Sequence, residues 1–339
     1  MEPVTHALTS VALARATQKR LPRFGTAILI VSGVAADLDY FSYFAGPAAF
    51  LRFHRAILHS LPGSLVLVSL IAGVFCWMNH KLPARKLAVP LPFIAAFTFA
   101  CLGASWHLLF DLSSGEGVQL LWPFRTSSLA WNLTTNFDLL ILFLLVAGLL
   151  MPALFRMVSE EIGERGKTEG LRRGASITML LLLAYLGARG ILHRHAVDLL
   201  YSREFHGRAP VIAGAFPQPG SPFSWRGVVF TDSTIEELIF SLAPGAQFDP
   251  DRSQSLFKPQ DSPALQAGEQ TAAARTFLNY ARFPFASVYP LENGSRFELR
   301  DLQFSRDDAS PANIIVRVDF NESLRIKREE FLFASSRSQ

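Results

Sequence analysis

The feature of this sequence that most constrains its fold is a series of apolar runs, each long enough to cross a lipid bilayer. A spanning helix needs about 20 mostly apolar residues. The runs that qualify are residues 61–79, 88–110, 136–155 and 174–192, with a fifth at 24–44 that is apolar through Ala36. Lipid offers no hydrogen-bond partners, so each run must satisfy its backbone as a helix. We therefore predict a polytopic bundle of five spans, preceded by a short helix over Val4–Ala16.

The composition of the chain changes near residue 195. Residues 1–195 consist mainly of apolar runs, whereas residues 196–339 mix polar, charged and proline residues as a soluble domain does. We therefore predict a transmembrane domain at residues 1–195 and a soluble domain at residues 196–339. Both cysteines, Cys76 and Cys101, lie in apolar runs, so the soluble part cannot build a disulfide framework or a thiolate zinc site.

The C-terminal part is predicted to be rich in β-structure. Its strand-like segments are Trp225–Phe230, Ser287–Pro290, Arg296–Phe304, Ile314–Phe320 and Ser323–Phe333. Asn293-Gly294 is a strong signal for a two-residue hairpin, and Thr271–Leu278 has the pattern of a short helix. The predicted fold class is thus an α-helical polytopic membrane bundle followed by a β-rich soluble domain.

Basic residues in the connecting segments predict the orientation, because Lys and Arg accumulate on the cytoplasmic side. Twelve of them share one face, namely Arg15, Lys19, Arg20, Arg23, Lys81, Arg85, Lys86, Arg156, Arg165, Lys167, Arg172 and Arg173. The other face has Arg52, Arg55 and Arg125. We therefore expect a protein of the cell inner (cytoplasmic) membrane whose C-terminal domain is extracytoplasmic. The net charge of +4 is small and spread between apolar runs, so no nucleic-acid partner is expected.

Seven histidines and aspartates are expected to lie near the outer face of this bundle. They are His6, Asp37, Asp39, His54, His59, His107 and Asp111. Ionisable residues in a span are costly and usually face the bundle interior or a wet cavity. His107 and Asp111 are four residues apart and share one face of a helix. Pro62, just after His59, suits the first turn of the next helix. Asp37 and Asp39 share a side only where their helix ends in an extended turn.

Four imidazoles and three carboxylates without a thiolate suit zinc, manganese or iron, and zinc is the usual choice for hydrolysis. Seven ligands exceed the three or four that one catalytic zinc takes, so the site is expected to hold one or two ions. The main ligands are predicted to be His6, Asp37, His59, His107 and Asp111, with Asp39 and His54 as further ones. Asp39 is also the candidate to bridge ions or to accept a proton from water. Arg55 either binds a phosphate oxygen beside the metal or pairs with an aspartate.

Each of these residues also has an ordinary structural interpretation. A single membrane histidine is more often a polar contact between helices. Asp37 and Asp39 can simply mark the end of a span, and the His107–Asp111 pair can hold two helices together. Glu116 is predicted to be a solvated loop carboxylate in preference to a base. All seven residues fall on one side under an orientation assigned from Lys and Arg alone, which favours the metal site.

Several of these motifs resemble a known family. They are Pro3-x-Thr5-His6, Asp37-Leu-Asp39, His54-Arg55-x-x-x-His59-Ser60, and His107-x-x-x-Asp111 with Leu121-Trp-Pro-Phe124 after it. In order and type they are similar to the membrane-bound, metal-dependent hydrolases typified by the YdjM inner-membrane protein. The resemblance covers residues 1–195 and implies a hydrolase without fixing its substrate. Ala36 stands where many members have proline. The stretch Ala281–Phe285 is similar to the C-terminal extension of some members.

The His-x-x-x-Asp motif is also, more distantly, similar to one in zinc-dependent phospholipases C and related nucleases. This second resemblance implies a phosphoester substrate. The expected function is that of an integral membrane hydrolase in which a metal-activated water attacks a phosphoester or similar bond. The bilayer and a lipid or lipid-linked substrate are the expected partners. An alternative function, from a different class of protein, is that of a transporter or metal/proton relay. A third possible function is that of a scaffold whose β-rich domain binds a partner.

Overall fold

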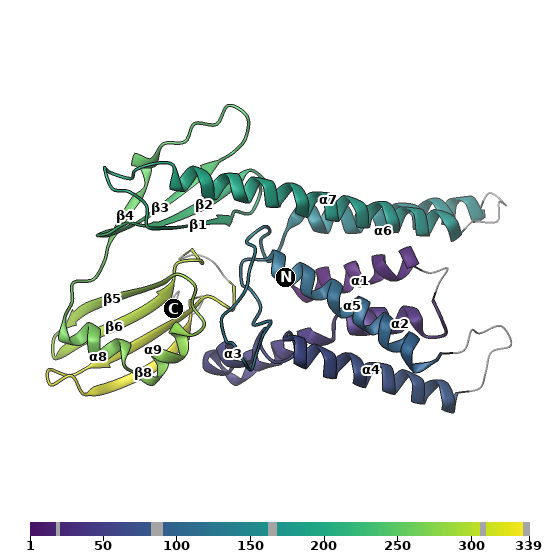
Figure 1. The fold of residues 1–339 in the computed structure, drawn as a ribbon, viewed down its shortest axis with the longest axis horizontal. Helices are drawn as coiled ribbons and strands as arrows, with labels where there is room; N and C mark the ends of the chain where they lie inside the picture. Colours follow the sequence, from purple (N-terminus) through teal and green to yellow (C-terminus); the bar gives the residue numbers. More distant parts are fainter. Residues whose placement is uncertain (18–20, 83–90, 162–167, 306–309, 335–339) are drawn as a thin grey trace. The chain divides into compact units, whose positions relative to one another are not determined.

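The computed structural model describes the chain except for residues 18–20, 83–90, 162–167, 306–309 and 335–339 (Figure 1). Several basic residues used to predict the orientation lie outside the described residues, namely Lys19, Arg20, Arg85, Lys86, Arg165 and Lys167. So do the first residues of the run 88–110. The described part forms two compact units, and each is treated separately below.

The two units interleave along the chain. The first, here called the bundle unit, comprises Met1–Leu38, Ile57–Trp122 and Leu129–Ile191. The second, here called the β unit, comprises Asp39–Ala56, Pro123–Ser128 and Leu192–Gln339. The β unit therefore includes two stretches from the N-terminal half of the chain.

Five helical segments are long and apolar enough to cross a membrane: Gly25–Ala45, Leu61–Lys81, Phe93–Ser113, Leu139–Val158 and Glu169–Tyr201. The helices that contain them are α2 (Gly25–Ser32), η2 (Ala35–Ala45), α4 (Leu61–Lys81), α5 (Phe93–Ser113), α6 (Leu139–Glu161) and α7 (Thr168–Tyr201). The predicted short N-terminal helix is α1 (Pro3–Thr17). The prediction of five spans with a short helix before them is confirmed.

The first span is not one regular α-helix. Its α-helical part ends at Ser32, and the chain continues from Ala35 as the 3-10 helix η2. An extended turn is the condition under which Asp37 and Asp39 would share a side, and the structure has the 3-10 helix η2 at these residues instead. A 3-10 helix has three residues per turn and can still redirect side chains near a functional site.

Small residues bring the helices of the bundle unit close together. α1 packs against α2, and α5 packs against both α2 and α4. A side chain at Gly33 would place its Cβ 2.0 Å from Ser10 Oγ, and one at Gly103 would place it 2.2 Å from Ser32 Oγ. Close approach over glycine, alanine and serine is the usual way that helices associate in lipid. These contacts fix α1, α2 and α5 relative to one another at the depth of the predicted site.

The β unit contains two four-stranded antiparallel sheets (Figure 1). The first has the order β1 (Ile212–Pro217), β2 (Ser224–Phe230), β3 (Thr234–Ser241) and β4 (Gln254–Phe257). The second has the order β5 (Pro284–Leu291), β6 (Gly294–Asp301), β7 (Ile314–Phe320) and β8 (Ile326–Phe333). Its helices are α3 (Pro47–Phe53), η3 (Pro250–Arg252), α8 (Pro263–Glu269) and α9 (Ala272–Leu278). The prediction of a β-rich region after the bundle is confirmed.

The strand predictions differ between the two sheets. All four strands of the second sheet and β2 of the first were expected, whereas β1, β3 and β4 were not. β1 is short and rich in alanine and glycine, and β3 carries Glu236 and Glu237, so neither has a clear strand pattern. The predicted hairpin joins β5 to β6. Leu291 pairs with Gly294, so the turn residues are Glu292 and Asn293, one position earlier than expected.

The two faces of the second sheet differ in character. One face packs Phe297, Val316 and Val318 against α8 and α9 in the main core of the β unit. The other face carries rows of alternating charge, because Glu298 pairs with Arg317 and Arg296 pairs with Asp319 across adjacent strands. This polar face lines a cavity of about 390 Å³. Opposite charges directly across strands stabilise the register.

The pair Arg296–Asp319 leads to a test of this charged face. The Arg296 guanidinium donates two hydrogen bonds to Asp319, at 2.7 and 3.0 Å, and holds the pKa of that carboxyl below its ordinary value. A lowered folded-state pKa means that the stabilisation is complete above the ordinary pKa and is lost as the pH falls through the lowered value. Asp319→Asn should lower the melting temperature at pH 7, by an amount that corresponds to less than about 1 kcal/mol.

The difference from wild type should shrink below about pH 4. Thermal unfolding of both full-length proteins between pH 7 and pH 3 measures it. The exposed Asp261 provides a control, since Asp261→Asn removes a carboxylate that has no cationic partner on the described chain. A difference for Asp319→Asn that stays constant over this pH range would contradict the prediction.

Candidate metal centre

Five of the seven predicted ligands belong to the bundle unit and lie at the ends of its helices. His6 is in the first turns of α1, and His59 precedes the first residue of α4 by two. His107 and Asp111 are in the last two turns of α5, and Asp37 is in the first turn of η2. Ser60 caps α4 by accepting a hydrogen bond from the Gly63 amide, which fixes the chain direction just after His59. The predicted helix start at His59–Pro62 is confirmed.

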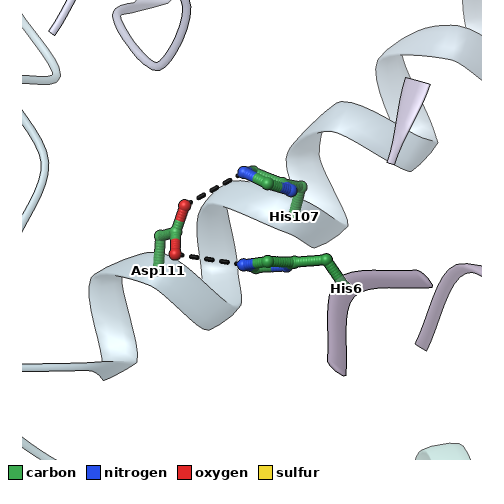
Figure 2. Close-up of side chains that lie close together, drawn as sticks. All are labelled: His6, His107 and Asp111. Carbon is green, nitrogen blue, oxygen red and sulfur yellow. Dashed lines mark hydrogen bonds and ion pairs between the residues drawn. The ribbon is translucent and has the colours of Figure 1, made fainter. Parts of the chain in front are cut away.

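Three ligand atoms from this set form a small triangle. His107 Nε2 lies 3.1 Å from His59 Nε2, and Asp111 Oδ2 lies 3.0 Å from each of these nitrogens. The side chains of His59, His107 and Asp111 are fully buried, with at most 1% of each exposed. Figure 2 shows His107 and Asp111 on successive turns of α5, with a ring nitrogen of His107 directed at the carboxylate. The spacing of four residues produces this arrangement, as expected.

A hydrogen bond to Gly33 assigns the tautomer of the neutral His107 ring. Its Nδ1 lies 2.9 Å from the carbonyl oxygen of Gly33. A carbonyl only accepts hydrogen bonds, so Nδ1 carries the proton, and Nε2 of the neutral ring presents a lone pair. This lone pair points at Asp111 Oδ2, which is itself an acceptor. Two acceptors 3.0 Å apart repel each other unless a proton or a cation lies between them.

His6 and Asp37 lie next to this triangle. His6 Nε2 lies 3.1 Å from Asp111 Oδ1, and its ring stacks on that of His107 with the centroids 3.8 Å apart (Figure 2). Asp37 Oδ1 lies 3.9 Å from His107 Nε2. Ligand atoms within 4.8 Å of one another form two overlapping groups in the described part, His6–His107–Asp111 and Asp37–His59–His107. His107 belongs to both groups. The amino nitrogen of Met1 is also 2.5 Å from Asp111 Oδ1.

The geometry of these atoms fits a metal ion. The three atoms lie about 1.8 Å from their common centre, close to the zinc–ligand bond of about 2.0–2.1 Å, so His59, His107 and Asp111 could hold one ion. Two further atoms, His6 Nδ1 and Asp37 Oδ2, are buried without a hydrogen-bond partner among the described residues. Burying such groups unpaired is costly, and a cation or an ordered water at the site would offset that cost. The Nδ1–H bond of His107 to a carbonyl is also the usual outer support of a metal-binding imidazole.

The structure places the other three predicted site residues in the β unit. His54 Nδ1 lies 3.0 Å from Asp39 Oδ1, and the backbone N–H of Arg55 donates to Asp39 Oδ2 at 2.7 Å. All three side chains are buried. Neither of the two groups of possible metal ligands in the described chain includes Asp39 or His54. Their predicted roles as ligands, and those of Asp39 and Arg55 in catalysis, stay predictions.

Glu116 shows a limit of reasoning from the sequence. It was expected to be a solvated loop carboxylate, but it is 4% exposed and accepts a hydrogen bond from the Asn136 amide. The expectation is wrong because the stretch after α5 folds back on itself. Ser114 bridges to Thr134, and Val118 pairs with Leu129. Isolated bridges of this kind leave no periodic pattern in a sequence.

A comparison with known protein families found a match for the N-terminal part of the chain. The family model of the YdjM inner membrane protein matches residues 1–196, which include α1 to α6, most of α7 and all seven predicted ligands. No curated protein and no solved structure matches the chain. The match covers more than half of the 339 residues and ends at the predicted boundary of the C-terminal domain. With its apolar spanning helices, the chain is therefore a membrane protein that belongs to the YdjM inner membrane protein family.

Proposed function

We propose that this protein is a metal-dependent hydrolase of the inner membrane. Zinc is the preferred ion, and the substrate is a lipid or lipid-linked phosphoester. The observation that carries the proposal is the buried triangle of His59 Nε2, His107 Nε2 and Asp111 Oδ2, in which two imidazole nitrogens and a carboxylate oxygen face one another at 3.0 to 3.1 Å. Such a group is costly as an empty structural contact and is suited to a divalent cation.

The residues divide into those that hold the ion and those that act beside it. His59, His107 and Asp111 hold it, and Gly33 orients His107 through its carbonyl oxygen. The bound zinc would supply Lewis-acid activation of a water molecule. Asp37 Oδ2 is a buried carboxylate oxygen without a hydrogen-bond partner among the described residues, which supports a role for Asp37 as the group that accepts a proton from water. His6 orients Asp111 from the opposite side through its contact with Oδ1.

The position of the site within the helices supports a lipid substrate. The triangle uses the residue two before the start of α4 and residues near the end of α5. These positions are at the ends of two spanning segments, where the lipid headgroup begins. A phosphoester at that depth can reach the ion while the acyl chains stay in the bilayer. The C-terminal domain is then extracytoplasmic, as the distribution of Lys and Arg favours.

Metal analysis tests the first step of this proposal. Wild-type protein purified in detergent without chelator should contain about one zinc per chain, or two if a second ion shares His107, as the three or four ligands of each zinc allow. Removal of the metal with a chelator should lower the melting temperature, and added zinc should restore it, because a ligand that binds only the folded state stabilises it. A protein that stays free of metal and keeps its melting temperature after chelation would contradict the proposal.

Activity on a lipid phosphoester tests the second step. Zinc-loaded wild type should release phosphate or a phosphorylated headgroup from mixed micelles, and Asp37→Asn should lose this activity while it keeps the zinc of the triangle His59–His107–Asp111. The alternative of a transporter or metal/proton relay predicts ion flux in proteoliposomes that His107→Ala abolishes. The ligand groups lie at one end of the spanning helices, which favours the hydrolase. Zinc binding with flux and without hydrolysis would decide for the transporter.

A further inference from the structure

Segment 39–56 connects two of the candidate ligands along the chain but folds with the C-terminal sheets. Asp37 comes two residues before its first residue, and His59 comes three residues after its last. The segment nevertheless belongs to the β unit. It includes α3, whose Phe50 and Leu51 are 2% and 3% exposed and form part of the main core of that unit.

Aromatic rings attach the middle of this segment to strand β8. Phe333, the last residue of β8, stacks on Tyr43 with ring centroids 4.7 Å apart and meets Phe50 at 6.3 Å. Phe50 in turn stacks on the imidazole of His54, with 4.2 Å between the centroids. Tyr40 packs edge-on against the same imidazole at 4.7 Å. A continuous series of ring contacts therefore leads from the C-terminal strand to His54.

A single carboxylate ties the two ends of the segment together. Asp39, its first residue, contacts His54 Nδ1 through Oδ1 at 3.0 Å and accepts the backbone N–H of Arg55 through Oδ2 at 2.7 Å. Arg55 has a φ of 54°, in the left-handed region that non-glycine residues seldom adopt. The ends are thus held at a fixed separation in a strained conformation, which persists only where the surroundings impose it.

We propose that the C-terminal β domain positions the metal ligands through segment 39–56, with Phe333 as the positioning residue. This inference rests on the proposed metal site. Because the Asp39–His54–Arg55 contact closes the segment, the docking of its rings on β8 limits where the chain can place Asp37 before it and His59 after it. Metal ligands must be held within a few tenths of an ångström, so loss of such support lowers affinity. The family match ends at residue 196, so strand β8, on which segment 39–56 packs, lies outside the matched region.

Strand β8 offers a matched control for Phe333. Phe331 is two residues away, faces the same side of the sheet and packs against the same core. Ring contacts with segment 39–56 are made by Phe333, whereas Phe331 makes none among the described residues. Both residues are half-buried. Phe333→Leu and Phe331→Leu therefore remove rings of equal size from the same strand, and only the first removes a ring contact with the segment.

The experiment measures zinc affinity of the full-length protein in detergent by competition with a chelator. Phe333→Leu should bind zinc about tenfold more weakly than wild type, the lower range for loss of outer support. Phe331→Leu should match wild type, and Phe333→Tyr, which keeps the ring, should restore the affinity. Tyr43→Leu removes the partner ring and should reproduce the loss even if Phe333→Leu fails to fold. Hydrogen exchange of residues 39–56 should be faster in the two weak variants.

The outcomes separate this inference from the proposed function. If wild type binds zinc and Phe333→Leu and Tyr43→Leu bind it equally well, the inference is overturned and the metal site stands. Equal weakening by Phe331→Leu would show a general loss of core stability and would also overturn the inference. If the wild-type protein binds no zinc, both the proposed metal site and the positioning role of Phe333 are contradicted.

Discussion

Replacement of Asp111 by asparagine is expected to remove zinc from the protein. Asp111 contacts His59 and His107 through Oδ2 and His6 through Oδ1, so it connects three imidazoles within one buried group. Asparagine has nearly the same volume and keeps one acceptor oxygen, but it has no charge. A buried cation then loses the only carboxylate of the triangle, and its affinity should fall by more than about 100-fold, beyond the range for loss of outer support.

The control for this substitution is Asp138→Asn. Asp138 is also a carboxylate in the bundle unit, where it accepts the backbone N–H of Leu140 and Ile141 and the hydroxyl of Tyr185. It does not belong to either ligand group of the described chain. Asp138→Asn should therefore keep its zinc. Elemental analysis of the three purified proteins measures the effect, and an Asp111→Asn protein with wild-type zinc content would refute the assignment of the metal centre.

The membrane helices could be predicted from the sequence because lipid imposes a simple requirement. In a chain of this composition, a run of about 20 apolar residues has few possible structures other than a spanning helix. The ligand pair on α5 could be predicted for a similar reason, since a spacing of four residues fixes the shared helix face before any tertiary contact is known. Strand β6 alternates apolar and polar residues, with inward Phe297 and Leu299 beside outward Glu298 and Arg300.

Other features depend on contacts that leave no local pattern. The carbonyl of Gly33 that orients His107 is a backbone group of another helix, so no side chain in the sequence indicates this contact. Residues 45–56 fall between the apolar runs 24–44 and 61–79, yet Phe50 and Leu51 complete a core whose other buried members come after residue 264. Burial of Glu116 follows from the fold of the stretch after α5. Each case requires knowledge of which distant residues meet.

The role of Gly33 can be tested by a substitution that tightens one contact. Gly33→Ala should lower the melting temperature and weaken zinc binding together. The Cβ of alanine would lie 2.0 Å from Ser10 Oγ and 3.0 Å from the Leu29 carbonyl oxygen, so the Ser10 side chain must rotate and α1 must shift slightly from α2. Overpacking of this kind costs about 1–3 kcal/mol. The φ of Gly33 is −79°, which alanine adopts freely, so backbone strain does not contribute.

A second substitution identifies the cause of the effect. Ser10→Ala removes the hydroxyl that the new Cβ would meet, and the remaining contact with the Ser10 Cβ, at 3.0 Å, needs only a small shift. The double variant should therefore regain much of the stability and zinc affinity, which a double-mutant cycle measures directly. Gly73→Ala is the control, because a Cβ there meets nothing within 4 Å and alanine favours the helix by about 1 kcal/mol. If Ser10→Ala does not rescue Gly33→Ala, the close contact between α1 and α2 is not what holds His6 and the Gly33 carbonyl at the metal centre.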